Sequence, residues 1–359
     1  MKTLMYLLKK STATWISFMI FTLILFIITG TSTSAVVSPT AISSTVTNTS
    51  LKTKYPIVMV HGIMGFDTLF KGASKILKSK SINYFFNIIE TLSARGAKVY
   101  AISMASSASS DQRERDLIDQ IKIILEKEKV AKVHLICHSQ GGITARHLLK
   151  HAPYLLASVT TVASPHMGSA VADYIRSNNI TSFFKNIIYK FLNLLGLAIE
   201  TFSGNNHSQD SVAAVYELSS IGSAQYNELY PTGLPLNWRN NPCDTEGIET
   251  NYQGVYLFSW NAIRPYNSHT TLDPADYLLK WSGKLFISMN NFDGELNDGL
   301  VGKCSSYFGQ VINKDPYNQN HLEEINLSVR SLLGLPPAPG RTDPMPLYIS
   351  HVKRLQSLE

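Results

Sequence analysis

The sequence is poor in charge and contains no long basic run. Asp, Glu, Lys and Arg make up 16% of its 359 residues, and the formal net charge is +6. Lys2, Lys9 and Lys10 supply three of these six charges, so the rest of the chain carries only a small excess. Because no basic run with interleaved aromatic residues occurs, we expect no nucleic-acid partner. Neither a P-loop nor a dinucleotide-binding glycine pattern is present, so we predict no nucleotide or redox cofactor.

The N-terminal apolar run, at 15–28, is too short for an ordinary membrane span. It follows basic residues and precedes small residues that end at Ala35. This pattern predicts a secretory signal peptide over 1–35 and hence a secreted, extracellular protein exported through the periplasm. An uncleaved membrane anchor is the alternative, but a spanning helix needs about 20 apolar residues. Residues 36–54 are rich in Ser, Thr and Val without a period, and we predict a flexible lead-in.

Cysteine is scarce, with three in the whole chain. In an exported protein an odd number predicts one disulfide and one free thiol. Cys137 lies in an apolar, strand-like run, and we expect it to be buried and reduced. Cys243 and Cys304 lie in polar, loop-like surroundings and are the candidates for the disulfide, but the sequence alone leaves the pairing open.

From residue 55 onward, apolar strand-like runs alternate with amphipathic helical patterns, in a chain long enough for one large domain or two ordinary ones. This order predicts a mostly parallel sheet with helices on both faces. Ligands of such sheets bind beyond the carboxyl ends of the strands, so the turn after each strand is a candidate site. The predicted strands cover 55–60, 98–103, the run that starts at 132, 158–163, 255–260 and 285–289. The predicted helices cover 82–95, 111–129 and 141–151.

Ser139 lies between an apolar run and a helical pattern. This is the arrangement of a nucleophile elbow, in which a sharp strand-to-helix turn lifts a serine toward a base. The elbow needs small residues two positions before and after the serine. Gly141 meets this requirement, while Cys137 stands where the G-x-S-x-G pattern has glycine. Cysteine is small, so the elbow remains possible; the alternative is an ordinary surface serine.

Three further turns supply the other groups that acyl transfer needs. The glycine-rich loop after the first strand and the residue after Ser139 predict the backbone N–H groups of Ile63 and Gln140 as an oxyanion hole. The alternative for that loop is a glycine-rich turn with no ligand. Asp298 and His321 lie in later loops and follow Ser139 in the chain order Ser, Asp, His, which predicts an orienting acid and a base.

Residues 180–202 interrupt the alternation with an unusually apolar stripe. One interpretation is an amphipathic core helix. The other is a movable lid that covers the serine in water and opens at a lipid surface. The pattern alone does not decide between them.

Several motifs occur together in an order that is typical of one family. The mature chain resembles the Pseudomonas- and Burkholderia-type true lipases, which are secreted α/β-hydrolases that act on triacylglycerols. The matching stretches are 55–62, 138–142, 164–169, 297–301, 320–326 and 347–355. The resemblance implies an α/β-hydrolase catalytic domain over 55–359, with a helical lid inserted at about 170–215.

The same resemblance implies roles for individual residues. Ser139 would be the nucleophile, His321 the base and Asp298 the orienting acid. Ile63 and Gln140 would form the oxyanion hole, and Cys243 and Cys304 would form the disulfide of the family. Many members of the family depend on a lipase-specific foldase, which is implied here as a partner.

The resemblance also implies a structural Ca²⁺ near the catalytic histidine. Its carboxylate ligands would be Asp273 and Glu323, although the family has aspartate at the second position. Ca²⁺ accepts either acid, but the longer glutamate side chain places its carboxylate farther from the backbone. Compared with the family, residues 326–335 carry about one extra helical turn, so the resemblance does not assign the two carbonyl ligands to particular residues. The alternative is a pair of solvated surface acids.

The function expected from this resemblance is hydrolysis of carboxylic esters of lipids by a triacylglycerol lipase. Alternatives with the same fold are a carboxylesterase for short soluble esters and a phospholipase or acyltransferase. An inactive lipid-binding module is a further alternative, but it requires a broken triad, and all three triad residues are present.

Overall fold

The computed structural model describes residues 50–70, 81–264, 274–288, 295–313 and 315–359. The predicted signal peptide, most of the lead-in and Asp273 lie outside these ranges. The end of the lead-in lies within them and is not a flexible segment. Leu51 is buried, its N–H donates to the Arg95 carbonyl at 2.8 Å, and the Gln356 side chain donates to the carbonyls of Ser50 and Lys52. The folded domain therefore begins before residue 55.

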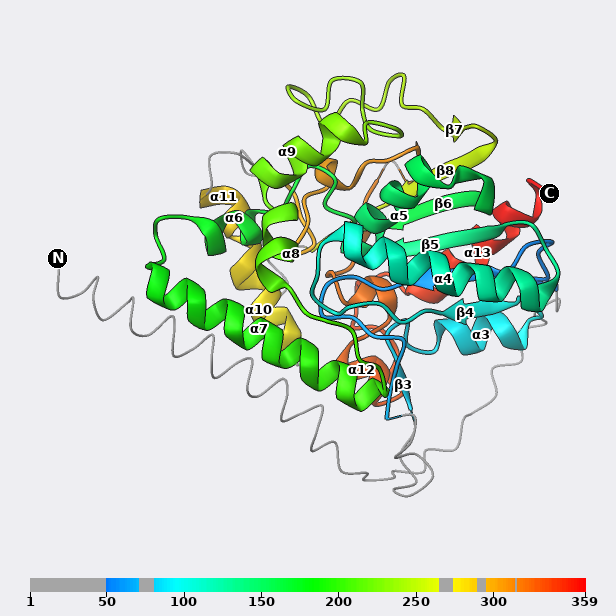
Figure 1. Ribbon diagram of the computed structural model, residues 1–359, viewed down its shortest axis with the longest axis horizontal. Helices are drawn as coiled ribbons and strands as arrows, with labels where there is room; N and C mark the ends of the chain where they lie inside the picture. The colour runs from blue at the N-terminus through cyan, green and yellow to red at the C-terminus, as the bar shows by residue number, and fades with distance from the viewer. Residues whose placement is uncertain (1–49, 71–80, 265–273, 289–294, 314) are drawn as a thin grey trace.

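A seven-stranded sheet crosses the molecule in the order β10-β8-β6-β5-β1-β4, with β7 paired to β8 (Figure 1). The strands on the main path are parallel, and β7 is antiparallel to its neighbour. The predicted parallel sheet is confirmed. The strands are β1 Ile57–Val60, β4 Val99–Ala101, β5 Val133–His138, β6 Leu156–Val162, β7 Asn251–Tyr252, β8 Val255–Trp260 and β10 Gln310–Val311.

Helices cover both faces of this sheet because its strands carry apolar residues on both sides. Val58 and Cys137 face one core, together with side chains of α4 and α5, which lie side by side (Figure 1). Ile57 and Met59 face a second core, together with α3 and α13. The helices are α3 Ile88–Ala94, α4 Ser110–Glu128, α5 Gln140–His151 and α13 Pro344–Gln356.

Two predicted elements are wrong. The helix predicted for 82–95 starts only at Ile88, because residues 82–83 form strand β3, which pairs antiparallel with β2 Thr68–Leu69. The strand predicted for 285–289 is the helix α11 Leu285–Ser288. Leu285 and the next side chain are buried while Ile287 is exposed, which is not the alternation of a strand. A short apolar run does not distinguish the two structures by period.

A group of helices follows β6 and stands apart from the sheet (Figure 1). These helices are α6 Ala170–Arg176, α7 Ser182–Ser203, α8 Ser211–Glu217 and α9 Ser220–Leu229. Shorter elements complete the described chain. They are η1 Pro153–Leu155, β9 Ala262–Ile263, α10 Pro274–Gly283, η2 Cys304–Ser306, β11 Tyr317–Asn318, η3 Glu323–Ile325 and α12 Val329–Leu332.

Candidate active site

Ser139 occupies the sharp turn between β5 and α5. Its backbone has φ 56° and ψ −130°, a conformation that costs energy for any residue with a side chain. The Ser139 N–H donates to the Val162 carbonyl at 2.9 Å, which anchors the turn on the neighbouring strand. The structure thus places the serine in the strained strand-to-helix turn that the elbow prediction requires.

The chain approaches this turn so closely that only glycine fits at two positions. A Cβ atom on Gly62 would lie 2.6 Å from the Ser139 Cβ, and one on Gly141 would lie 2.6 Å from the Val60 carbonyl oxygen. Cys137 is less restricted, because its side chain points into the core below α4 and α5. It is a free, fully buried cysteine, and burial raises the pKa of its thiol well above the usual range.

Asp298 and His321 form a buried hydrogen-bonded pair. His321 Nδ1 donates to Asp298 Oδ2 at 2.7 Å. The other carboxylate oxygen accepts the N–H groups of Leu300 and Val301, both at 2.8 Å. The His321 N–H also donates to the Asp298 carbonyl at 3.1 Å. With the carboxylate held from both sides, the imidazole keeps Nε2 as the atom available to accept a proton.

A chain of buried hydrogen bonds connects His321 to the loop beside the serine. The Gly62 N–H donates to the Tyr84 hydroxyl at 3.3 Å, and this hydroxyl lies 2.8 Å from His138 Nδ1. His138 Nε2 lies 3.0 Å from the His321 carbonyl oxygen. Burial, with a smaller effect of His321, lowers the pKa of His138 well below its usual value, so the ring is neutral. Since a carbonyl only accepts, Nε2 donates and Nδ1 accepts from Tyr84.

The loop that carries Ile63 is held by an arginine from α4. The buried guanidinium of Arg113 donates to the carbonyls of His61 and Gly62 and, at 2.8 Å, to that of Ala105. Burial lowers the pKa of Arg113 to about 10, so it stays charged at neutral pH. Ile63 follows the glycine that faces Ser139, and Gln140 is the first residue of α5. Both predicted oxyanion donors therefore lie in segments that flank the serine.

Sequence reasoning missed the residues that hold these parts together. Tyr84 lies in a segment that was predicted to be helical, and Arg113 lies in a helix whose exposed face is charged. No local pattern marks either side chain as buried. His138 belongs to the elbow motif, but its contact with His321 joins residues 183 positions apart.

Comparison with known proteins agrees with this geometry. A family model for the alpha/beta hydrolase fold matches residues 55–321. The chain belongs to the α/β-hydrolase family. It is 36% identical over 309 residues to a triacylglycerol lipase of Vibrio cholerae, covering 85% of this chain and 88% of that one. It is 33% identical over 345 residues to a triacylglycerol lipase of Burkholderia plantarii, covering 89% and 90%.

The solved structure of a Staphylococcus hyicus lipase has the same fold as this α/β-hydrolase. Its TM-score is 0.56 at 18% sequence identity, over 86% of this chain and 96% of that one. At this identity the likeness concerns the fold alone. Together with the curated relatives, it confirms the predicted fold class and the resemblance to Burkholderia-type lipases.

The apolar stripe of this α/β-hydrolase forms α7, and it is not a core helix. Phe183 is 69% exposed and Leu194 64%, and other large apolar side chains of the helix are exposed as well. Its buried residues are Gly196, Glu200 and Ser203. α7 is long and apolar enough to cross a membrane, but a single helix of this length and composition does not establish a membrane span. The structure therefore rejects the core-helix interpretation.

The C-terminal end of α7 is tied to the loops around the active site. Glu200 is buried and accepts hydrogen bonds from the backbone N–H and the hydroxyl of Ser106 at 3.2 and 3.1 Å. The Ser106 carbonyl in turn accepts the N–H of Met64, which follows Ile63, at 2.6 Å. Nearby, Glu217 of α8 accepts from the Gln140 side chain at 3.1 Å. The inserted helices thus contact both segments that carry the predicted oxyanion donors.

Glu323, the described half of the predicted calcium pair, already faces a cation. Its Oε2 accepts the Asn320 N–H at 2.8 Å and lies 3.6 Å from Arg341 Nη1. The same guanidinium lies 3.2 Å from Asp276. An arginine therefore lies beside this carboxylate, while Asp273, the other predicted ligand, lies outside the described residues. Groups of histidine and acidic side chains that could hold a cation occur elsewhere in the described chain, one of them formed by Asp298, His321 and Glu324.

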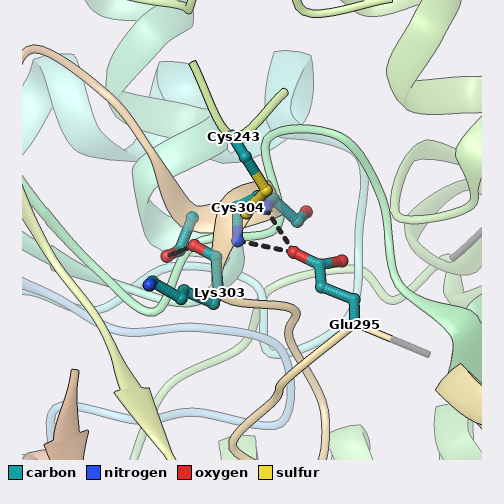
Figure 2. The surroundings of a disulfide bond; sticks show 6 residues. Cys243, Glu295, Lys303 and Cys304 are labelled. Atoms are coloured by element: carbon teal, nitrogen blue, oxygen red, sulfur yellow. Dashed lines mark hydrogen bonds between the residues drawn. A yellow bond between two sulfur atoms is a disulfide. The ribbon is translucent and has the colours of Figure 1, made fainter. Parts of the chain in front are cut away.

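A disulfide joins Cys243 to Cys304, the predicted pair (Figure 2). Cys304 follows the loop that carries Asp298, so the disulfide links that loop to the segment before β7. Glu295 lies beside it and accepts the backbone N–H groups of Cys304 and Ser305 (Figure 2). Burial raises the pKa of Glu295 to about 7, and its two hydrogen bonds offset only part of that effect.

Proposed function

We propose that this α/β-hydrolase is a secreted triacylglycerol lipase. The observation that carries the proposal is the combination of a buried elbow serine with an apolar surface helix that is tied to the oxyanion loop. An exposed apolar helix beside the site suits a lipid substrate better than a small soluble ester. The curated relatives named triacylglycerol lipase, which match over most of both chains, support the same conclusion.

The reaction follows from the roles of five residues. His321 takes the proton of Ser139 as the hydroxyl attacks the ester carbonyl, and Asp298 stabilises the resulting imidazolium. The backbone N–H groups of Ile63 and Gln140 stabilise the oxyanion. His321 then protonates the leaving alcohol, which leaves an acyl-enzyme. Water attacks this intermediate by the same route, and the fatty acid is released.

In this proposal α7 belongs to a lid that responds to lipid surfaces. Ser139 is buried, so substrate entry requires a movement of the chain around it. Covering an exposed apolar helix with an oil surface is favourable, because it removes apolar area from water. The tie between Glu200 and Ser106 gives this movement a direct connection to the oxyanion loop.

A carboxylesterase, a phospholipase and an acyltransferase can use the same catalytic groups. The exposed apolar face of α7 favours a lipid substrate over a short soluble ester, and substrate profiling separates the lipid-acting candidates. An inactive lipid-binding module is disfavoured by the intact hydrogen bond between His321 and Asp298.

Export, the signal peptide over 1–35 and assistance by a lipase-specific foldase also belong to the proposal. They are supported by the N-terminal sequence pattern and by the resemblance alone. Expression of the mature chain with and without a foldase of a related lipase would test the partner, with the yield of soluble active enzyme as the measurement.

The proposal includes calcium binding by Asp273 and Glu323. Arg341 competes with the ion for the carboxylate of Glu323. If the ion binds, Ca²⁺ should raise the melting temperature of the wild type, and Glu323→Gln should abolish that rise. Arg341→Gln should increase the response to Ca²⁺, because it removes the competing cation. A melting temperature that is the same in calcium and in chelator for all three proteins would contradict the calcium site.

The decisive experiment compares hydrolysis of an emulsified long-chain triacylglycerol with that of a short soluble ester. Purified mature protein and its Ser139→Ala variant would be assayed side by side. Activity on droplets that disappears in the variant supports a lipase. Activity on the soluble ester alone identifies an esterase. Correctly folded protein without activity on either substrate contradicts the proposed triad.

A further inference from the structure

Three side chains that the catalytic reaction does not use meet between α4 and α5. Glu114 comes from α4, and His147 and His151 stand one turn apart on α5. His151 Nδ1 lies 2.9 Å from Glu114 Oε1, and His147 Nδ1 lies 3.4 Å from Glu114 Oε2. The nitrogen and oxygen atoms that these residues can offer to one ion all lie within 4.8 Å of one another.

His147 is the unusual member of this cluster. It is 6% exposed, and its ring contacts those of Tyr226 and Tyr230, with centroids 5.2 and 4.3 Å away. Its Nδ1 is buried and makes no hydrogen bond within the described part of the chain. An imidazole that is held in place with an unused, buried nitrogen near a carboxylate can take a further ligand.

We propose that Glu114, His147 and His151 form a binding site for a divalent cation of the zinc class. Two imidazoles and one carboxylate are a donor set that zinc uses in proteins, with water as the fourth ligand. Ligand atoms at about 2.0–2.2 Å from a tetrahedral ion lie roughly 3.4 Å apart. The single oxygen Oε2 of Glu114 lies 3.1 Å from His151 Nδ1 and 3.4 Å from His147 Nδ1, which is close to this value.

The donor set selects the class of metal. Ca²⁺ and Mg²⁺ prefer six or more oxygen ligands, whereas imidazole suits zinc and its neighbours in the first transition series. The His151 side chain is 50% exposed, so one side of the cluster is open to solvent for entry of the ion and a bound water. Glu114 and His147 are buried and set the position of the ion from inside.

This site is separate from the catalytic centre. His147 and His151 follow Ser139 by eight and twelve positions, which corresponds to roughly 12–18 Å along α5. A bound ion would join α4 to α5. Arg113 lies on α4, and α5 starts directly after Ser139. The effect of the ion is therefore to cross-link these two helices, with no part in the acyl transfer.

The test is titration of the mature protein, purified without a histidine tag, with ZnCl₂ in a calorimeter. The wild type should bind one zinc ion tightly. His151→Gln and Glu114→Gln should each weaken that binding by at least about tenfold, because even groups that merely support metal ligands contribute that much. His151 is half-exposed, so its variant is expected to fold, and circular dichroism checks this for both.

Two variants control for other histidines. His207→Gln removes a histidine that pairs with a carboxylate elsewhere, and His321→Gln removes the one in the catalytic cluster. Both should bind zinc at the new site as the wild type does. Co²⁺ absorbance typical of four-coordinate geometry should appear in the wild type and be lost in His151→Gln.

Three results would overturn the site. The first is a wild type without a tight zinc site. The second is unchanged binding in His151→Gln and Glu114→Gln. The third is loss of the tight site in His321→Gln, with binding kept in the cluster variants, which would assign the ion to the catalytic residues.

Discussion

At the scale of single residues, the hydroxyl of Tyr84 connects the two halves of the active site. It accepts from Gly62, the residue before the predicted oxyanion donor Ile63, and donates to His138, which in turn donates to the carbonyl of His321. In Tyr84→Phe two buried polar groups lose their partner. We expect the free energy of unfolding to fall by about 1–3 kcal/mol. We expect kcat to fall about ten- to hundredfold with little change in KM, since positioning is lost and binding is not.

Tyr348→Phe is a matched control for this prediction. Tyr348 is as deeply buried, but its hydroxyl makes no hydrogen bond within the described residues. Its removal should change stability by less than about 0.5 kcal/mol and leave kcat unchanged. Steady-state kinetics and urea unfolding of both variants check the pair. Equal effects of the two substitutions would contradict a positioning role for Tyr84.

Glu295 predicts a pH dependence of stability. Its pKa is about 7 in the folded protein, against 4.5 for an ordinary glutamate. Between these two pH values Glu295 holds a proton in the folded protein that it has lost in the unfolded chain. The contribution of Glu295 to stability is therefore fully present below pH 4.5 and is lost as the pH rises through 7. Glu295→Gln should remove this loss, which amounts to about 3 kcal/mol.

The measurement is urea unfolding of wild type and Glu295→Gln at pH 5 and pH 8. From pH 5 to pH 8 the free energy of unfolding should fall more in the wild type than in Glu295→Gln. The glutamine can still accept from Cys304 and Ser305, so the hydrogen bonds near the disulfide are kept. Parallel pH profiles of the two proteins would show that Glu295 titrates normally.

At the scale of elements, α7 is a helix of apolar composition whose large apolar side chains are exposed. We expect Leu194→Gln to lower activity on triacylglycerol droplets several-fold, because it removes apolar surface that an oil phase would cover. Activity on a short soluble ester should be unchanged, and stability should change by less than about 0.5 kcal/mol.

Ile123→Gln on α4 is the matched control, because both side chains are 64% exposed. It should leave droplet activity at the wild-type level. Droplet binding, measured by depletion of protein from the aqueous phase, should follow the same order. If both variants lose droplet activity equally, the effect is one of general surface polarity and α7 has no special role.

At the scale of the whole molecule, the disulfide constrains a large loop. Cys243 and Cys304 are 61 positions apart, and loop-closure entropy predicts a stabilisation of about 4 kcal/mol. The double variant Cys243→Ala/Cys304→Ala should lose about 2–5 kcal/mol in chemical unfolding. In reductant the wild type should fall to the level of the variant. A variant as stable as the oxidised wild type would contradict this contribution.

The sequence by itself determined the parts of this protein that depend on neighbouring residues. The elbow at Ser139 and the order of strands and helices were predicted because a turn, a cap or an apolar period is set within a few positions. Asp298 and His321 were found through chain order and resemblance, since no local pattern pairs them. The short run at 285–289 was misassigned because its period does not separate a helix from a strand.

Only the tertiary structure decided which side chains lose contact with water. Arg113, Tyr84 and His138 became positioning groups because the sheet and α4 bury them against loops far away in the sequence. The stripe of α7 resembles a core helix in composition, and only packing leaves it exposed. The Glu114, His147 and His151 cluster likewise exists because α4 packs on α5. Burial and long-range contact depend on the whole fold, whereas turns and periods are properties of short segments.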